Sequence, residues 1–112
     1  MITNDRLEAA RIRQVDIYGL DVASMDASGF AAYMAEQVAS LFVEVGEFAE
    51  ELPYRQWKMV AVDNTKLLAE LADILIYITN ILAGLDITED EVRRALEAKI
   101  VYNLERHANV RT

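Results

Sequence analysis

The sequence predicts an all-α protein, a bundle of four to five helices, on three observations. Its 112 residues include one proline and four glycines, so few positions break a helix. The alternation of apolar and polar residues that marks β-strands is rare. Between residues 30 and 52, apolar residues recur instead at spacings of four and three, as on one face of a helix. The length fits one domain spanning residues 1–112.

The chain is expected to begin with a short helix and a connecting loop. Residues 4–14 have the pattern of an amphipathic helix, with Leu7, Ala10 and Ile12 facing inward. Residues 15–28 have a mixed composition without a period, which predicts a loop.

Three further helices follow. The second covers about residues 30–52 and the third about residues 65–83, with an ambiguous segment at 54–62 between them. The fourth runs to about residue 108 and opens with the capping-box spacing from Thr88 to Glu91. The second helix is expected to be capped by Asp26 or Ser28 and to stop at Pro53. The third is expected to be capped by Asp63 or Asn64 and to end at Gly84.

Composition excludes several classes of function. The formal net charge is −8, which argues against binding along a polymeric nucleic acid, because phosphate neutralisation needs clustered Lys and Arg. The chain has no cysteine and one histidine, His107, so thiolate sites, His-rich zinc sites and a Ser-His-Asp triad are not expected. We expect no signal peptide and a cytoplasmic protein. The apolar stretch at residues 67–85 contains Glu70 and Asp73, which favours a deeply buried helix over a membrane span.

Counting 100° per residue places the polar side chains of the second and third helices on one flank of each. Within these flanks, Glu44/Glu47 and Glu70/Asp73 form two pairs spaced i, i+3. The third helix is otherwise apolar on most faces, so its polar flank needs a cavity, a partner charge or a metal. The flanks consist of Gln37, Ser40, Glu44, Glu47 and Glu51, and of Lys66, Glu70, Asp73, Tyr77 and Asn80.

If the two helices lie side by side, four carboxylates meet in one cleft, and cations or protons must neutralise them. Oxygen ligands without His or Cys favour Mg²⁺, with Mn²⁺ as a substitute. A di-iron bundle is the competing metal site, but it uses Glu-x-x-His pairs that this chain lacks. A single Glu-x-x-Glu pair is most often only a solvated face, and the apolar surroundings of the second pair favour the metal site.

Two other features allow a functional and a structural interpretation. Lys99, Asn103 and Arg106 lie on one stripe of the fourth helix and could hold phosphate oxygens and a nucleoside. Basic residues near a helix C-terminus are also favoured by the helix dipole alone. Trp57 could stack on a nucleobase or fill the core.

Residues 43–50 (VEVGEFAE), followed by residues 70–77 (ELADILIY), resemble the MazG family of all-α nucleoside triphosphate pyrophosphohydrolases. Lys99-x-x-x-Asn103-x-x-Arg106 is similar to the C-terminal element of that family, and Val43 stands where many relatives have a glutamate. The resemblance covers roughly residues 37–106.

The resemblance implies a homo-oligomer, a dimer or tetramer, that hydrolyses a nucleoside triphosphate to the monophosphate and pyrophosphate with Mg²⁺. It implies nucleotide-pool cleaning with a preference for deoxynucleotides. Hydrolysis of phosphoribosyl-ATP or dUTP is the alternative within the superfamily, and a non-catalytic helical oligomerisation module is the alternative from another class. The implied metal ligands and catalytic residues are Glu44, Glu47, Glu70 and Asp73, and the implied substrate contacts are Lys99, Asn103 and Arg106. From their positions in the chain, Trp57, Tyr77 and Asn80 are further candidate substrate contacts.

Overall fold

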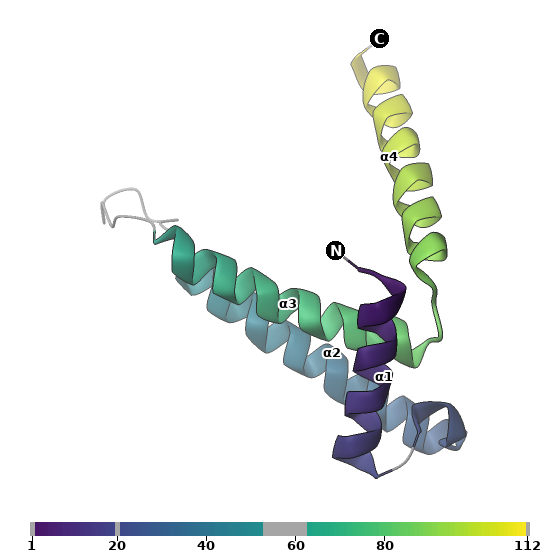
Figure 1. The fold of residues 1–112 in the computed structure, drawn as a ribbon. Helices are drawn as coiled ribbons and strands as arrows, with labels where there is room; N and C mark the ends of the chain where they lie inside the picture. The colour runs from purple at the N-terminus through teal and green to yellow at the C-terminus, as the bar shows by residue number, and fades with distance from the viewer. Residues whose placement is uncertain (1, 20, 53–62, 112) are drawn as a thin grey trace.

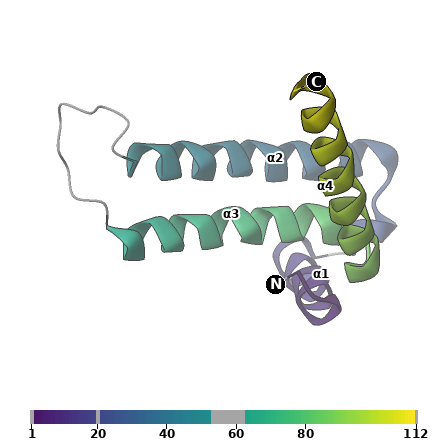
Figure 2. The same cartoon turned by 90° about the horizontal axis from the view of Figure 1, so that it is seen from above.

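Four α-helices make up the fold of the computed structural model, which describes residues 2–19, 21–52 and 63–111. They are α1 (Asn4–Tyr18), α2 (Ala27–Glu50), α3 (Asn64–Gly84) and α4 (Glu89–Arg111), with a short 3-10 helix, η1 (Val22–Ser24), before α2. Long helices α2 and α3 lie side by side, α1 crosses α3, and α4 projects away from the other three (Figure 1; Figure 2). The all-α prediction is confirmed, but within one chain α4 does not join a closed bundle.

The first helix is longer than predicted. It continues to Tyr18 and ends at Gly19, whose φ of 76° closes the helix with a hydrogen bond from its N–H to the Val15 carbonyl (2.8 Å). Leu7 and Ala10 are buried as expected, whereas Ile12 is 57% exposed and its inward placement was wrong. The connection between α1 and α2 is therefore shorter than the predicted loop at residues 15–28, because the first residues of that segment belong to α1.

Both long helices begin at a predicted cap. The Asp26 carboxylate accepts a hydrogen bond from the Gly29 N–H (2.7 Å) at the start of α2. Asp63 accepts from the N–H groups of Thr65 and Lys66 at the start of α3. Pro53 and the segment 54–62, which includes Trp57, lie outside the described residues.

Gly84 does not end α3 in the predicted way. It is the last helical residue, and the left-handed conformation that reverses the chain belongs to Asp86, with φ 57°. A glycine is needed at position 84 for a different reason, since a Cβ atom there would lie 2.9 Å from Cε1 of the buried Tyr33 ring.

The expected Thr88 cap at the start of α4 is confirmed, and the Glu91 carboxylate contacts the Thr88 hydroxyl instead of the Thr88 backbone N–H. The Glu91 N–H donates to the Thr88 hydroxyl oxygen (3.3 Å), and that hydroxyl donates to the Glu91 carboxylate (3.1 Å). The helix continues to Arg111, slightly beyond the predicted end.

The core of the described chain is small. Leu7, Ala10 and Ala83 form its centre, where α1 crosses the end of α3. The expected deep burial of α3 is wrong for one chain, because Leu68 is 69% exposed and Ile76 is 45% exposed. By length and composition α3 could cross a membrane, a property that it shares with core helices of soluble proteins.

The contact between Gly84 and Tyr33 generates a test of the fold. We expect Gly84→Ala to destabilise the protein by about 1–2 kcal/mol, because the buried ring must shift to admit the methyl group. Gly46→Ala in α2 is the matched control, since a Cβ there meets nothing within 4 Å and alanine gains about 1 kcal/mol of helix propensity. Thermal unfolding followed by circular dichroism distinguishes them, and a Gly84→Ala variant as stable as Gly46→Ala would contradict the close approach.

Candidate metal centre

The polar flanks of α2 and α3 meet in a defined antiparallel register. The buried Asn80 side-chain amide donates to the buried Gln37 side-chain oxygen across the helix pair (3.2 Å). Glu44 lies seven residues after Gln37 in α2, and Asp73 lies seven residues before Asn80 in α3. A further three residues along each helix bring Glu47 opposite Glu70. Since both helices rise by the same distance per residue, one register aligns all three pairs.

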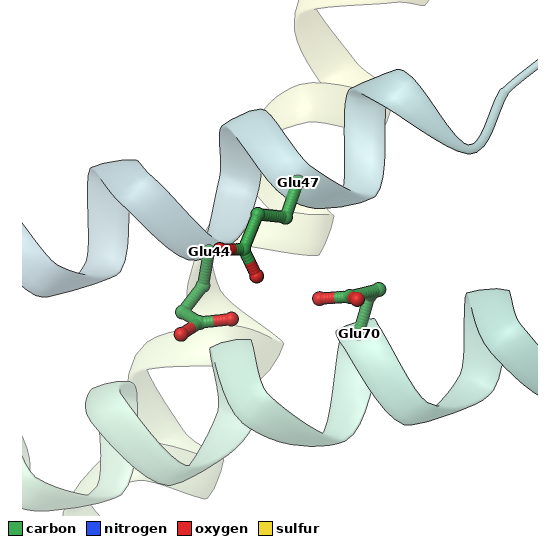
Figure 3. Close-up of side chains that lie close together, drawn as sticks. All are labelled: Glu44, Glu47 and Glu70. Carbon is green, nitrogen blue, oxygen red and sulfur yellow. The ribbon is translucent and has the colours of Figure 1, made fainter.

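Three carboxylates converge between the two helices. Glu44 and Glu47 extend from α2 and Glu70 from α3 into the same space (Figure 3). Each contributes an oxygen, and these oxygens lie within 4.8 Å of one another. Glu44 and Glu70 are half-buried, whereas Glu47 is exposed.

The carboxylates of Glu44 and Glu70 are held in an unfavourable environment. One oxygen of each, Oε2, is shielded from solvent and has no hydrogen-bond partner among the described residues. Burial raises the pKa of both carboxyl groups above the ordinary value, and the negative charges of Glu47 and Asp73 raise them further. In the charged form of this cluster, these two oxygens therefore have neither solvent nor a hydrogen-bond donor beside them.

A divalent cation fits this arrangement. It would supply the missing partner for the shielded Oε2 atoms and offset the mutual repulsion of the carboxylates. The donors offered are all oxygens, which suits Mg²⁺ and Mn²⁺.

The remaining predicted residues of α3 lie on the same flank in different environments. Asp73 is exposed and outside the tight group of three, yet close enough to raise the pKa of Glu44 and Glu70. Tyr77 is half-buried. Asn80 is 8% exposed and its amide is engaged by Gln37, so its place in the structure is the contact between the helices.

The basic stripe of α4 is not brought to the acidic cluster within this chain. Lys99, Asn103 and Arg106 are exposed on a helix that points away from α2 and α3 (Figure 1). Lys99 lies over the ring of Tyr102, 4.9 Å from its centroid. Trp57 lies outside the described residues.

Sequence reasoning missed the aromatic contact at the other end of this flank. Tyr33 is 3% exposed, its hydroxyl donates to the Asn80 backbone carbonyl (3.4 Å), and its ring meets Tyr18 edge-on at 5.4 Å. Burial raises the pKa of Tyr33 to about 12, so its hydroxyl stays protonated as a donor. The place of Tyr33 could have been predicted from the sequence, because Tyr33 lies four residues before Gln37 and therefore on the same flank of α2.

The comparisons with known proteins identify the family of the chain. A family model described as dUTPase matches residues 14–110, which include α2, α3, nearly all of α4 and every carboxylate of the cluster. No curated protein and no solved structure matches the chain. The resemblance to MazG holds at the level of the superfamily that the two families share. The chain belongs to the dUTPase family of the all-α nucleoside triphosphate pyrophosphatases, and it is an enzyme of that class.

Proposed function

We propose that this enzyme hydrolyses dUTP to dUMP and pyrophosphate, with Mg²⁺ held by Glu44, Glu47, Glu70 and Asp73. The observation that carries the proposal is the convergence of carboxylates with unpartnered, shielded oxygens between α2 and α3. The family match favours dUTP over a broad range of deoxynucleotides and over phosphoribosyl-ATP.

The carboxylates have separable tasks in this reaction. Glu44 and Glu70, the more enclosed pair, would bind the cation most directly, with Asp73 at the exposed edge. When bound, Mg²⁺ would offset the triphosphate charge and lower the pKa of a coordinated water. Glu47 is exposed beside them and would orient the attacking water and accept its proton. The water oxygen forms the new bond to phosphorus, the bond to the departing phosphate oxygen breaks, and dUMP and pyrophosphate separate.

Substrate contacts require more than one chain. Lys99, Asn103 and Arg106 would hold phosphate oxygens and nucleoside, with Trp57, Tyr77 and Asn80 as further candidates near the base or sugar. Within one chain α4 points away from the acidic cluster, so its stripe would act at a site of another copy (Figure 1). The cysteine-free composition supports a cytoplasmic location.

The surface of the chain supports a homo-oligomer. Its accessible area is 8526 Å², whereas a compact monomer of 12.7 kDa exposes about 6,200 Å². Its radius of gyration is 17.7 Å, against about 13 Å for a compact chain of this length. An excess of roughly 2,300 Å² per chain is in the range that obligate interfaces bury.

Substrate choice is tested by incubating the protein with dUTP, dTTP, dCTP, UTP and phosphoribosyl-ATP, each with Mg²⁺ or with EDTA. We expect metal-dependent dUMP and pyrophosphate, with a kcat/KM for dUTP at least tenfold above the others. Ion-exchange separation identifies the products. Release of dUDP and orthophosphate, or equal rates on every triphosphate, would contradict the proposal.

The metal assignment is tested by Glu70→Gln, which keeps the shape of the side chain and removes its charge. We expect kcat to fall at least about a hundredfold, since the cation contributes several kcal/mol of transition-state stabilisation. Glu50→Gln is the matched control, because Glu50 is an exposed carboxylate of α2 that lies outside the tight group of three and should retain activity. Circular dichroism confirms that both variants are folded, and an active Glu70→Gln enzyme removes Glu70 from the metal site.

The raised pKa values predict how the metal-free protein responds to pH. Glu44 and Glu70 bind protons more tightly in the folded chain than at their ordinary pKa of 4.5. Their charged forms therefore oppose folding at neutral pH, and this opposition is relieved as pH falls towards 4.5. In EDTA, we expect Tm to be higher for Glu70→Gln than for wild type at pH 7, with the difference shrinking near pH 5. A difference that does not change with pH contradicts the assigned environment.

A further inference from the structure

The direction in which α4 leaves the other helices is set by a built junction. After α3, the left-handed Asp86 reverses the chain, and the Ile87 N–H donates to the Leu82 carbonyl (3.0 Å). The first N–H of α4, on Glu89, donates to the Asn4 side-chain oxygen at the start of α1 (3.0 Å). One backbone and one side-chain hydrogen bond therefore tie the base of α4 to α3 and α1, and they specify its projection away from α2 and α3.

Beyond that junction, α4 presents an uncovered apolar stripe. From Glu89 to Ala108, every side chain except Val92 is exposed. A helix of this length gains most of its stability from packing an apolar face, and within its own chain this one has little to pack against. The stripe continues from Val92 at four-residue intervals through Leu96, Ile100 and Leu104, which are 59%, 57% and 65% exposed.

The described residues also form a mainly apolar groove between α1 and α3. Its volume is about 400 Å³, and Ala9, Leu75 and Ile76 form part of its wall. Two arginines of α1, Arg6 and Arg13, stand at this groove two turns apart. The groove continues into the exposed outer face of α3, which is apolar at Leu68, Leu71 and Leu75.

The two surfaces match in charge as well as in polarity. Residues 89–97 of α4 contain Glu89, Asp90, Glu91 and Glu97 against two arginines, so this half of the helix is net acidic. Its acidic half would lie opposite the arginines of the groove, and its apolar stripe opposite Leu75 and Ile76. The stripe and the groove together are part of the excess exposed area, roughly 2,300 Å² per chain, that a compact monomer would bury.

We propose that α4 is an exchanged arm, which docks in the α1–α3 groove of a second copy of this chain while the arm of that copy docks in return. No α4 residue lines the groove in the described part of the chain, and the junction at Asp86 and Asn4 directs α4 away from α2 and α3 (Figure 1). This leaves another copy as the source of the helix. Reciprocal exchange gives a closed two-fold dimer, in which each contact occurs twice. This inference rests on the proposed homo-oligomer and adds the surface and the segment that form it.

The absence of cysteine from the sequence allows a direct test by disulfide cross-linking. One chain carries Ala9→Cys in the groove; a second, with a larger affinity tag, carries Val92→Cys, Leu96→Cys or Ile100→Cys in the stripe. The two are co-expressed, oxidised and separated on non-reducing gels. Because the cysteines are on different chains, a disulfide of the mixed mass reports only contact between copies.

We expect the mixed disulfide with at least one stripe position in more than half of the paired chains. Ala98→Cys is the matched control, since Ala98 lies on the opposite side of α4 and should cross-link at least tenfold less. If sedimentation shows a dimer but the stripe positions do not cross-link, or cross-link no more than Ala98→Cys, the arm placement is overturned. The proposed homo-oligomer would still stand.

Two further outcomes also overturn the proposal. A chain carrying Ala9→Cys and Leu96→Cys together that forms only an internal disulfide shows that α4 folds onto its own groove. A monomer that floats with phosphatidylcholine vesicles shows that a lipid surface covers these faces. Activity on dUTP is measured separately, so that loss of the arm contact and loss of the proposed reaction are distinguished.

Discussion

The antiparallel contact between α2 and α3 is the constraint on which the rest of the structure depends. Its register brings Glu44, Glu47 and Glu70 into one space, where their charges repel and two of their oxygens have neither solvent nor a donor. A helix pair selected only for stability would place apolar side chains there. The arrangement is best understood as one that is completed by a cation, because the cation converts the least favourable part of the contact into a binding site.

This register is held by neutral polar groups at the other end of the contact. The hydrogen bond between Gln37 and Asn80 and the approach of Tyr33 to Gly84 each fit only one alignment of the helices. Apolar side chains alone would tolerate sliding by a turn, whereas a buried amide pair that lost its partner would carry a desolvation penalty. These contacts lie two turns or more from the carboxylates, so they position the acidic cluster without contributing a ligand.

Much of the site could be predicted from the sequence because it depends on local geometry. The spacing of Glu44 from Glu47 and of Glu70 from Asp73 determines which side chains share a helix face, and two adjacent helices then bring the faces together. The caps at Asp26, Asp63 and Thr88 were predictable for the same reason, since each hydrogen bond spans only two or three residues.

The errors concern residues whose environment depends on distant parts of the chain or on other chains. Ile12 has the right spacing to face inward but lies outside the contact between α1 and α3. Gly84 is a residue type that often ends helices, which is why it was expected to end α3. The side chain that it contacts in space, Tyr33, is about 50 positions away in the sequence. For Leu68 and Leu96, periodicity predicts an apolar face, but no pattern in one sequence specifies which surface covers it.

The division of charge between the helices connects assembly to the chemistry. The helix pair α2–α3 carries the acidic cluster, which would repel a polyanionic triphosphate unless cations stand between them. The basic groups that we propose to contact the phosphates lie on α4, beyond a junction that directs them away. One chain therefore has the two halves of the proposed triphosphate site in separate places. In an assembly with exchanged arms, the basic side chains of α4 in one copy would approach the carboxylates of another. Hydrolysis would then depend on the same contact that covers the apolar surface.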